Sequence, residues 1–350
     1  MSISFEIGKR RIGAGSNVFV IAELSANHNQ NFEQAAALVH AAHEAGADAI
    51  KLQTYTPDTL TIKADGKCFR VGGGTLWDGR TLYDLYSEAY TPWEWHPKLK
   101  SIANELGMEL FSSAFDPTAV DFLEDMGVPV HKVASFEVVD IPLIEKMAQT
   151  GKPLIISTGM ASLAEIEEAV GAARRAGAAE IALLKCTSAY PASPEDMNLK
   201  TIPHLAEAFQ TPVGLSDHTM GATVPAAAVA LGACIVEKHL TLSRSLGGPD
   251  GAFSLEPDEF KQMVDAVRTV EKAVGQVHYG LSSGELRSRA FRRSLFVVED
   301  VKQGDAFTPE NVRSIRPANG LPPKHLKQVL GRRAGVDIKR GTPLEWELLA

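Results

Sequence analysis

The chain has 350 residues, of which 45% are hydrophobic and 22% are charged, a composition typical of a folded protein with a sizeable core. Its formal net charge of −8 argues against a general binder of nucleic acid or of anionic membrane surfaces. No stretch has the pattern of a signal peptide or a membrane-spanning helix, and the three cysteines lack metal-finger spacing, so we expect reduced thiols and a cytoplasmic location.

Eight short, mainly apolar runs alternate with longer amphipathic stretches along most of the chain. The runs cover residues 18–22, 49–52, 109–111, 130–133, 153–156, 180–184, 211–214 and 233–236. Helical patterns lie between them, for example at residues 33–45, 163–176 and 224–231. Eight β-then-α units predict an α/β fold, a (β/α)8 TIM barrel over residues 1–278.

A doubly wound open sheet is the alternative to the barrel. Such a sheet more often carries a glycine-rich loop after its first strand. In this chain that position holds Glu23-Leu24-Ser25-Ala26-Asn27-His28 instead. The first strand therefore favours the barrel.

The pattern changes after the eighth unit. Residues 279–293 are polar and basic, as in a linker or an exposed helix. Residues 294–350 begin with an apolar strand pattern and then carry frequent turn signals, which predicts a small, mostly β domain. Because so short a segment buries little core alone, we expect it to dock on the barrel or on a second subunit.

Polar side chains end the predicted strands. They include Glu23, Lys51, Gln53, Ser113, Lys132, Ser135, Glu137, Ser157, Ser188, Tyr190, Ser216, His218 and His239. The active sites of barrel enzymes lie at the C-terminal ends of the strands. Ordinary polar loops, the alternative, would be richer in Gly, Asn, Asp and Pro. The sequence therefore predicts an active-site rim.

Two histidines, His218 and His239, follow the seventh and eighth predicted strands. Neighbouring strands lie about 5 Å apart, so the two rings can converge on one ion. Imidazole suits Mn, Fe, Co or Zn, and two protein ligands leave positions for water and substrate. Spacing alone leaves open whether they are a metal pair or ordinary rim residues.

Four serines and two lysines of the rim predict an anion pocket. The serines are Ser113, Ser135, Ser157 and Ser216, and the lysines are Lys51 and Lys132. Hydroxyls and loop amides donate to phosphate or carboxylate oxygens, and lysine supplies the charge. A Schiff-base role for one of the lysines is the alternative, because a desolvated lysine becomes a nucleophile.

Glu23 and Glu137 are the candidate proton-transfer groups, since a carboxyl on a barrel rim can be tuned towards a neutral pKa. Either can instead be a salt-bridge partner of a rim lysine. The aromatic side chains between Trp77 and Trp95 favour a small satellite core in the long connection after the second strand, with a platform for a sugar as the alternative.

Several motifs resemble those of the sialic acid synthase family, over nearly the whole chain. They are Ile21-Ala22-Glu23 with Asn27-His28, Lys51-Leu52-Gln53-Thr54, Lys185-Cys186-Thr187, Gly214-Leu215-Ser216-Asp217-His218-Thr219, Gly248-Pro249-Asp250 and, in the tail, Ile315-Arg316-Pro317-Ala318-Asn319-Gly320. The resemblance implies a (β/α)8 barrel, a C-terminal SAF (antifreeze-like) domain that caps the partner's active site in a swapped homodimer, and a divalent ion, usually Mn²⁺, with Mg²⁺ or Co²⁺ as alternatives.

Site residues carry over from the family position by position. The resemblance places phosphoenolpyruvate on Lys51, Ser113, Lys132, Ser135, Ser157, Ser188 and Ser216. It places the metal on His218 and His239, and the sugar on Gln53, Tyr190, Asp250 and Arg316, the last from the partner subunit. It implies that Glu23 and Glu137, with Lys51 and Lys132, are the catalytic groups.

Some positions depart from the N-acetylneuraminate synthases. Ser188 stands where they typically have Asn, and Phe136 where they have Gly. These departures and the segments 72–79 and 89–96 resemble the pseudaminic acid synthase branch. That branch condenses phosphoenolpyruvate with a 2,4-diacetamido-2,4,6-trideoxy-hexose (the L-altrose form) and water to give pseudaminic acid and phosphate.

Two alternatives remain beside this expectation. One is a synthase for N-acetylneuraminate or legionaminate. The other is a sugar-binding protein without turnover, which should have lost a histidine, a lysine or a carboxylate of the site, and this chain retains them all.

Overall fold

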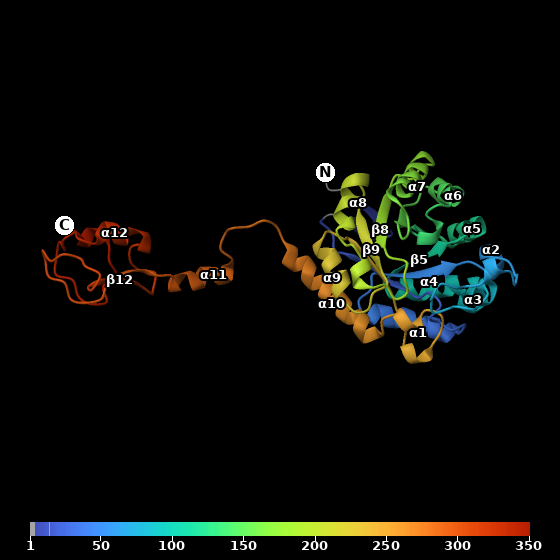
Figure 1. Ribbon diagram of the computed structural model, residues 1–350, viewed down its shortest axis with the longest axis horizontal. Coiled ribbons are helices and arrows are strands. Elements are labelled where there is room, and N and C mark those ends of the chain that lie inside the picture. The colour runs from blue at the N-terminus through green and yellow to red at the C-terminus, as the bar shows by residue number, and fades with distance from the viewer. Residues whose placement is uncertain (1–3, 14) are drawn as a thin grey trace. The chain divides into compact units, whose positions relative to one another are not determined.

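The computed structural model describes residues 4–13 and 15–350, which form two compact units (Figure 1). The first unit ends at Gly275, and the second runs from Gln276 to Ala350. Each has its own hydrophobic core, so each is described by itself.

The first unit is a closed barrel of eight parallel strands in the order β10-β3-β4-β5-β6-β7-β8-β9. The strands are β3 Phe19–Glu23, β4 Ala49–Thr54, β5 Glu109–Ala114, β6 His131–Val133, β7 Leu154–Ser157, β8 Ile181–Cys186, β9 Val213–Asp217 and β10 Ile235–His239. Pairing of β10 with β3 closes the cylinder. The predicted barrel is therefore confirmed, and the open-sheet alternative is wrong.

The strands form because their residues suit a sheet that is covered on both faces. All five residues of β3, of β9 and of β10 are buried. Strands buried on both sides are continuous apolar runs rather than alternating ones, and this is the pattern in the sequence. The strands extend beyond those runs through polar residues, to Thr54 in β4 and His239 in β10.

A helix follows every barrel strand, and in Figure 1 these helices surround the sheet. They are α1 Phe32–Glu44, α4 His96–Glu105, α5 Pro117–Met126, α6 Ile141–Gln149, α7 Leu163–Arg175, α8 Thr201–Phe209, α9 Thr223–Ala230 and α10 Pro257–Val274. Side-chain caps start several of them. Ser162 and Glu165 form a capping box at α7, and Asn31 caps α1.

The long connection between β4 and α4 contains α2 Pro57–Leu60 and α3 Leu82–Ala89. Tyr55 contacts Tyr86, and Trp93 contacts Phe122 of α5. Trp93 and Trp95 pack against the two core clusters of the barrel, so the prediction of a separate satellite core is wrong for these side chains. Trp77 makes different contacts.

A short hairpin precedes the barrel and was absent from the sequence-based prediction. Its strands are β1 Ser4–Ile7 and β2 Arg10–Gly13, paired antiparallel. Phe5, Ile7 and Ile12 are buried in the same core as Phe19 of β3. The hairpin therefore adds apolar surface to the barrel core.

The second unit has a two-stranded antiparallel sheet, β11 Ser294–Val297 and β12 Val312–Ile315, with α11 Ser283–Ser288 and α12 Leu326–Val329. Its core is small and includes Leu295, Phe307 and Leu344. Residues 272–293, which lead to β11, are exposed. A small domain with an antiparallel sheet agrees with the predicted tail.

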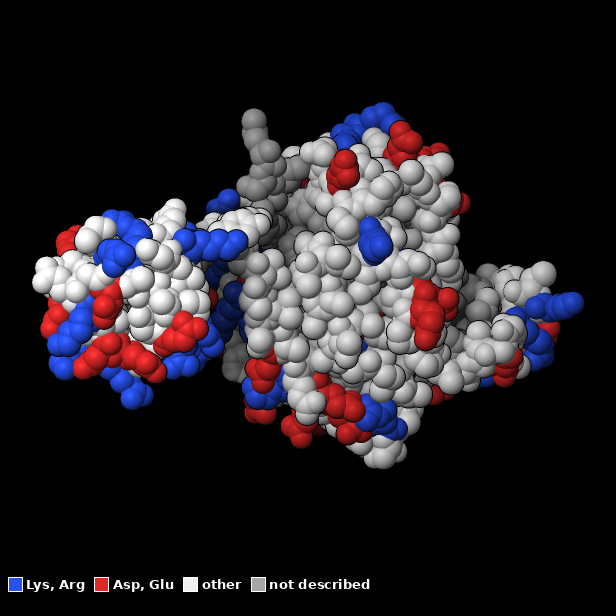
Figure 2. Space-filling model, turned by 60° about the vertical axis from the view of Figure 1, so that its left-hand side comes forward, with Lys and Arg blue, Asp and Glu red and all other residues white. Residues whose placement is uncertain are grey.

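In the part of the chain that the structure describes, no helix is both long and apolar enough to cross a bilayer. In Figure 2, Lys and Arg lie beside Asp and Glu on the smaller unit and around the edges of the larger one, and few charged residues lie across the middle of the face shown.

Candidate active site

Strand register brings the predicted rim residues together at one end of the barrel. Glu23 of β3 lies opposite Lys51 of β4 on one side and His239 of β10 on the other. Ser113 of β5 lies opposite Gln53 and Lys132, and Ser216 of β9 lies opposite Glu237. Parallel strands have their C-terminal ends at the same edge, so these residues form a ring.

Lys51 is the centre of a buried charge cluster. Its Nζ lies 2.7 Å from Glu23 Oε2 and 3.4 Å from Glu237 Oε1, and it donates to Ser113 Oγ at 3.4 Å. Burial raises the pKa of Glu23 to about 7, against the opposing effect of Lys51. Burial disfavours the Lys51 cation, but Glu23 and Glu237 outweigh it and raise the Lys51 pKa above its ordinary value. Lys51 therefore stays charged.

Glu237 is a buried carboxylate of this pocket that the sequence analysis did not select. It accepts a hydrogen bond from Ser216 Oγ at 3.0 Å. Although burial opposes ionisation, the Lys51 and Lys132 cations hold the pKa of Glu237 below its ordinary value. A signal was present in the sequence, because Glu237 stands two residues before His239 and so faces the same side of the strand.

Lys132 is the second buried cation of the pocket. Its Nζ donates to Ser157 Oγ at 2.7 Å and to the carbonyl of Val133 at 2.8 Å. Burial lowers the Lys132 pKa to about 8. The side chain is thus held by two acceptors while its charge remains available to an anion.

A narrow cradle lies beside Lys132, where Gly159 follows β7. Its backbone N–H donates to Ser135 Oγ at 3.2 Å. A Cβ at this position would stand 2.7 Å from Ser135 Oγ and would also overlap Ser188 Oγ. Only glycine at this position leaves both hydroxyls in place. Gly159 was not among the site residues predicted from the sequence.

Glu137 lies in a short 3₁₀ turn, Ser135–Glu137, directly after β6. Its Oε2 is buried and has no hydrogen-bond partner among the described residues. Burial raises the pKa of Glu137 to about 7. An acid with such a pKa can both give and take a proton near neutral pH.

His218 and His239 form a ring pair with centroids 5.3 Å apart. His218 Nδ1 lies 2.9 Å from the Thr187 carbonyl, which only accepts, so Nδ1 donates and the neutral ring keeps its lone pair on Nε2. Among the described residues, buried His239 Nδ1 has no hydrogen-bond partner, and burial holds the pKa of His239 well below its ordinary value. Although burial opposes the cation, Cys186 and the Thr187 carbonyl raise the pKa of His218. In the neutral form each ring offers a lone pair, and the pair fits a divalent ion.

The described part of the chain places no third protein ligand beside the pair. Among residues 4–13 and 15–350, no group of three or more His, Cys, Asp or Glu side chains is arranged to hold an ion. An ion held by two imidazoles keeps several positions for water and substrate oxygen.

The residues predicted to bind the sugar extend outward from this centre. Gln53 Nε2 donates to Glu23 Oε1 at 3.1 Å and to Ser25 Oγ at 2.9 Å, and Ser25 in turn donates to Asp250. The ring of Tyr190 lies 4.4 Å from that of His218. Gln53, Tyr190 and Asp250 are thus linked to the carboxylate and the histidines. Arg316 belongs to the second unit, where it is exposed after β12.

Asn27 and His28, which carried part of the family resemblance, connect loops. Asn27 Nδ2 donates to the Leu240 carbonyl and to Ser254 Oγ. The His28 ring bonds to Thr91 Oγ1 at 3.1 Å, and burial lowers its pKa to about 4. Both side chains therefore hold the rim loops in place.

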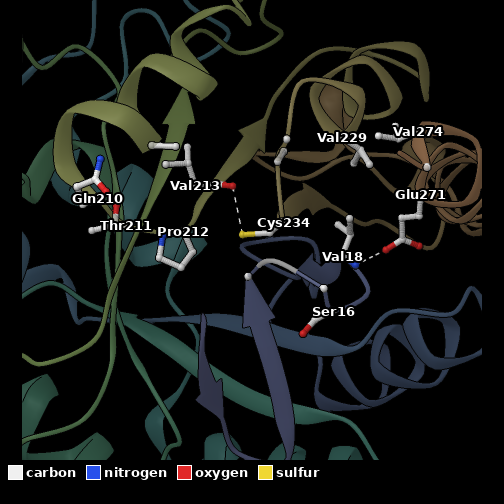
Figure 3. A pocket seen from close by; sticks show the side chains of 16 residues that line it. Ser16, Val18, Gln210, Thr211, Pro212, Val213, Val229, Cys234, Glu271 and Val274 are labelled. Carbon is white, nitrogen blue, oxygen red and sulfur yellow. Dashed lines mark hydrogen bonds between the residues drawn. The ribbon is translucent and has the colours of Figure 1, made fainter. Parts of the chain in front are cut away.

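A cavity of about 590 Å³ lies elsewhere, at the N-terminal ends of the strands (Figure 3). Its lining includes Val18, Thr211 and Cys234, which precede β3, β9 and β10. None of the predicted site residues lines it. We therefore place the active site at the polar rim and not in this cavity.

A closed parallel barrel with two buried lysines, a serine cradle and an imidazole pair at its C-terminal rim is an enzyme scaffold for anionic substrates. The NeuB family model matches residues 38–279, and the SAF domain model matches residues 292–350. The chain belongs to the NeuB family, the sialic acid synthases.

Named relatives match along nearly the whole chain. The pseudaminic acid synthase of Helicobacter pylori is 45% identical, covering 93% of this chain and 96% of its own. That of Campylobacter jejuni serotype O:2 is 47% identical, covering 94% and 95%. The crystal structure of the N-acetylneuraminic acid synthetase of Leptospira borgpetersenii, with citrate, superposes with a TM-score of 0.73 at 31% identity, covering 82% of this chain and 95% of that one. The predicted family and the enzyme class are confirmed.

Proposed function

We propose that this enzyme condenses phosphoenolpyruvate with a 2,4-diacetamido-2,4,6-trideoxy-hexose in the L-altrose form and water, giving pseudaminic acid and phosphate. The observation that carries the proposal is the convergence of Lys51, Lys132 and the serine hydroxyls beside the imidazole pair. The names of the 45–47% identical relatives support the acceptor.

The two lysines and the serines are the proposed phosphoenolpyruvate site. The substrate carries a phosphate and a carboxylate, and the pocket offers two buried cations within reach of short hydroxyl donors. Their contribution is to position the substrate and to stabilise the charge that leaves with phosphate. The Lys132 Nζ is held by Ser157 Oγ and the Val133 carbonyl, among hydroxyls that suit an anionic substrate, which favours a charged anion-binding lysine over the Schiff-base alternative.

In the proposed reaction, C3 of phosphoenolpyruvate forms a bond to the aldehyde carbon of the open-chain sugar. Water adds at C2, and the C2–O bond to phosphate breaks. Water loses one proton as it adds at C2 and a second as phosphate departs and the C2 carbonyl forms; one proton goes to the aldehyde oxygen and the other to phosphate. Glu23 and Glu137 are the groups whose pKa near 7 suits these transfers.

We propose that His218 and His239 hold a divalent ion, Mn²⁺ in the first place and Mg²⁺ or Co²⁺ as alternatives. The lone pairs of the two buried rings support this assignment. Such an ion would supply Lewis-acid polarisation of the sugar aldehyde.

The acceptor assignment distinguishes this chain from other synthases of the family. Identity to the pseudaminic acid synthases is 45–47%, against 31% to the N-acetylneuraminic acid synthetase structure. Ser188 and Phe136 are positions where the neuraminate enzymes differ. N-acetylneuraminate or legionaminate synthesis is the second candidate.

We further propose a homodimer in which the second unit caps the partner's site and contributes Arg316. An apolar patch on the barrel rim supports it: Phe136 and Met160 are 60% and 62% exposed, and Val139 and Leu163 lie nearby in the chain. The exposed connection at residues 272–293 supports it too. A reducing, cytoplasmic setting is proposed on the three free cysteines.

The test is a phosphate-release assay with phosphoenolpyruvate, Mn²⁺ and a panel of acceptors. We expect kcat/KM for the diacetamido sugar to exceed that for N-acetylmannosamine by about a hundredfold or more. The reason is that polar groups of the site that bind the second acetamido group have no hydrogen-bond partner when N-acetylmannosamine is bound. Equal values, or a preference for N-acetylmannosamine, would move the chain to the second candidate.

A further inference from the structure

Trp77 stands apart from the other aromatic residues of the β4–α4 connection. Its ring lies 5.7 Å from that of Tyr190, between centroids, and its indole N–H donates to the Pro249 carbonyl at 2.9 Å. Trp93, by contrast, packs on Phe122 and the barrel core, and Tyr86 packs on Tyr55. The two contacts of Trp77 thus reach segments that follow β8 and β10.

Both contacts lead to residues of the acceptor side. Tyr190 lies 4.4 Å from His218, so Trp77 is the second ring outward from the histidine pair. Pro249 directly precedes Asp250, which accepts from Ser25 in the network of Gln53. Trp77 therefore borders the place where the sugar must lie if phosphoenolpyruvate occupies the lysine pocket.

The Trp77 ring retains exposed surface. The Trp77 side chain is only partly buried, and its single polar group is already used by Pro249. The loop before it is held by Asp78, which accepts from the amides of Gly74 and Thr75. What Trp77 can offer a sugar is therefore a positioned apolar surface.

We propose that Trp77 is a specificity-determining residue that packs against a methyl-bearing substituent of the acceptor, an acetamido methyl or the C6 methyl of a deoxy sugar. This inference rests on the proposed function and names the residue that selects the acceptor. An apolar wall of this kind discriminates for a methyl group by about tenfold or more.

The experiment compares kcat/KM for the diacetamido-6-deoxy sugar, its 6-hydroxy counterpart and N-acetylmannosamine in four proteins. These are the wild type, Trp77→Ala, Trp77→Phe and the control Trp93→Phe. Trp93 is a matched control because it also packs on a ring, Phe122, and donates to a carbonyl, that of Tyr55, but against the barrel core and away from Tyr190.

We expect Trp77→Ala to lower the preference for the diacetamido sugar over N-acetylmannosamine at least tenfold, with the KM for phosphoenolpyruvate changed less than twofold. Trp77→Phe, which keeps an apolar ring, should retain the preference within about threefold, and Trp93→Phe should leave it unchanged. If Trp77→Ala also loses the preference for the 6-deoxy sugar over its 6-hydroxy counterpart, the contact is with the C6 methyl. If that preference is unchanged, the contact is with an acetamido methyl.

An unchanged preference in Trp77→Ala overturns the inference while the proposed function stands. A loss of preference in Trp93→Phe equal to that in Trp77→Ala also overturns it, because the effect would then come from the loop as a whole. A wild type inactive on all three sugars contradicts the proposed function itself.

Discussion

Burial sets the charge state of single side chains in this pocket. Lys51 and Glu237 stay ionised because each faces opposite charge, whereas Glu23 and Glu137 are pushed towards the protonated form near neutral pH. An acid with a pKa near 7 can both give and take a proton near neutral pH, and the neighbouring cations can stabilise negative charge. Both properties suit a reaction that forms a carbon–carbon bond with proton transfer.

Glu137→Gln should stabilise the protein and inactivate it. The folded-state pKa of Glu137 is about 7 against an ordinary 4.5, so its ionisation destabilises the fold as pH rises from 4.5 through 7, and below 4.5 the effect vanishes. We expect a gain of up to about 3 kcal/mol at pH 8 and almost none at pH 4.5, with turnover down about a hundredfold or more. Thermal melts at both pH values and phosphate release check this. A lower Tm at pH 8 would contradict it.

His239→Ala should abolish binding of Mn²⁺ while the barrel stays folded, because His218 and His239 are the two imidazoles that the described residues bring together for the ion. Titration calorimetry with Mn²⁺ measures binding apart from turnover, and circular dichroism reports the fold. Chelator should silence the wild type, and Mn²⁺ should restore it. Mn²⁺ affinity within threefold of wild type in His239→Ala would refute the assignment.

At the scale of elements, the turns after the strands give the pocket its shape. Gly159 follows β7 at the point where the hydroxyls of Ser135 and Ser188 approach the backbone. One added methyl group there must displace them.

Gly159→Ala should raise the KM for phosphoenolpyruvate at least tenfold and leave the KM for the sugar within twofold. The matched control is Gly171→Ala inside α7, where the new Cβ meets only the flexible end of Arg175. The control should keep both KM values and gain up to about 1 kcal/mol, because alanine favours a helix. Equal KM values for phosphoenolpyruvate in the two variants would count against the cradle.

The sequence predicted the barrel because each strand is an apolar run, followed by a helical pattern and often a glycine. It placed several strand ends too early, since Ser216, Glu237 and His239 are polar yet lie inside the sheet. The hairpin Ser4–Gly13 was missed because two four-residue strands carry too little periodicity. Glu237 was missed although it stands two residues before His239, because its ion pair with Lys51 of β4 forms only when β10 pairs with β3 and closes the barrel.

At the scale of the whole molecule, the chain contains a second unit whose role does not follow from the barrel. It has a separate small core, and Arg316 is exposed on it. The family resemblance, and no local pattern, assigned that arginine to a partner's site.

Mixing Arg316→Ala with Lys51→Ala subunits should restore activity that neither variant has. In a swapped dimer, one of the two sites receives an intact barrel and an intact arginine, so random pairing regains up to about a quarter of wild-type turnover. The assay is phosphate release after co-refolding, with each variant alone as control. Activity of the mixture equal to the mean of the two variants would favour a site completed within one chain.

The central claim is carbon–carbon bond formation from phosphoenolpyruvate with loss of phosphate by C–O cleavage. The direct measurement uses phosphoenolpyruvate labelled with ¹⁸O in the oxygen between C2 and phosphorus, with Mn²⁺ and the diacetamido sugar, and mass spectrometry of both products. We predict that all the label appears in inorganic phosphate and that an unlabelled nine-carbon sugar acid forms in equal amount. Label retained in the sugar acid, or phosphate released without that acid, would contradict the account.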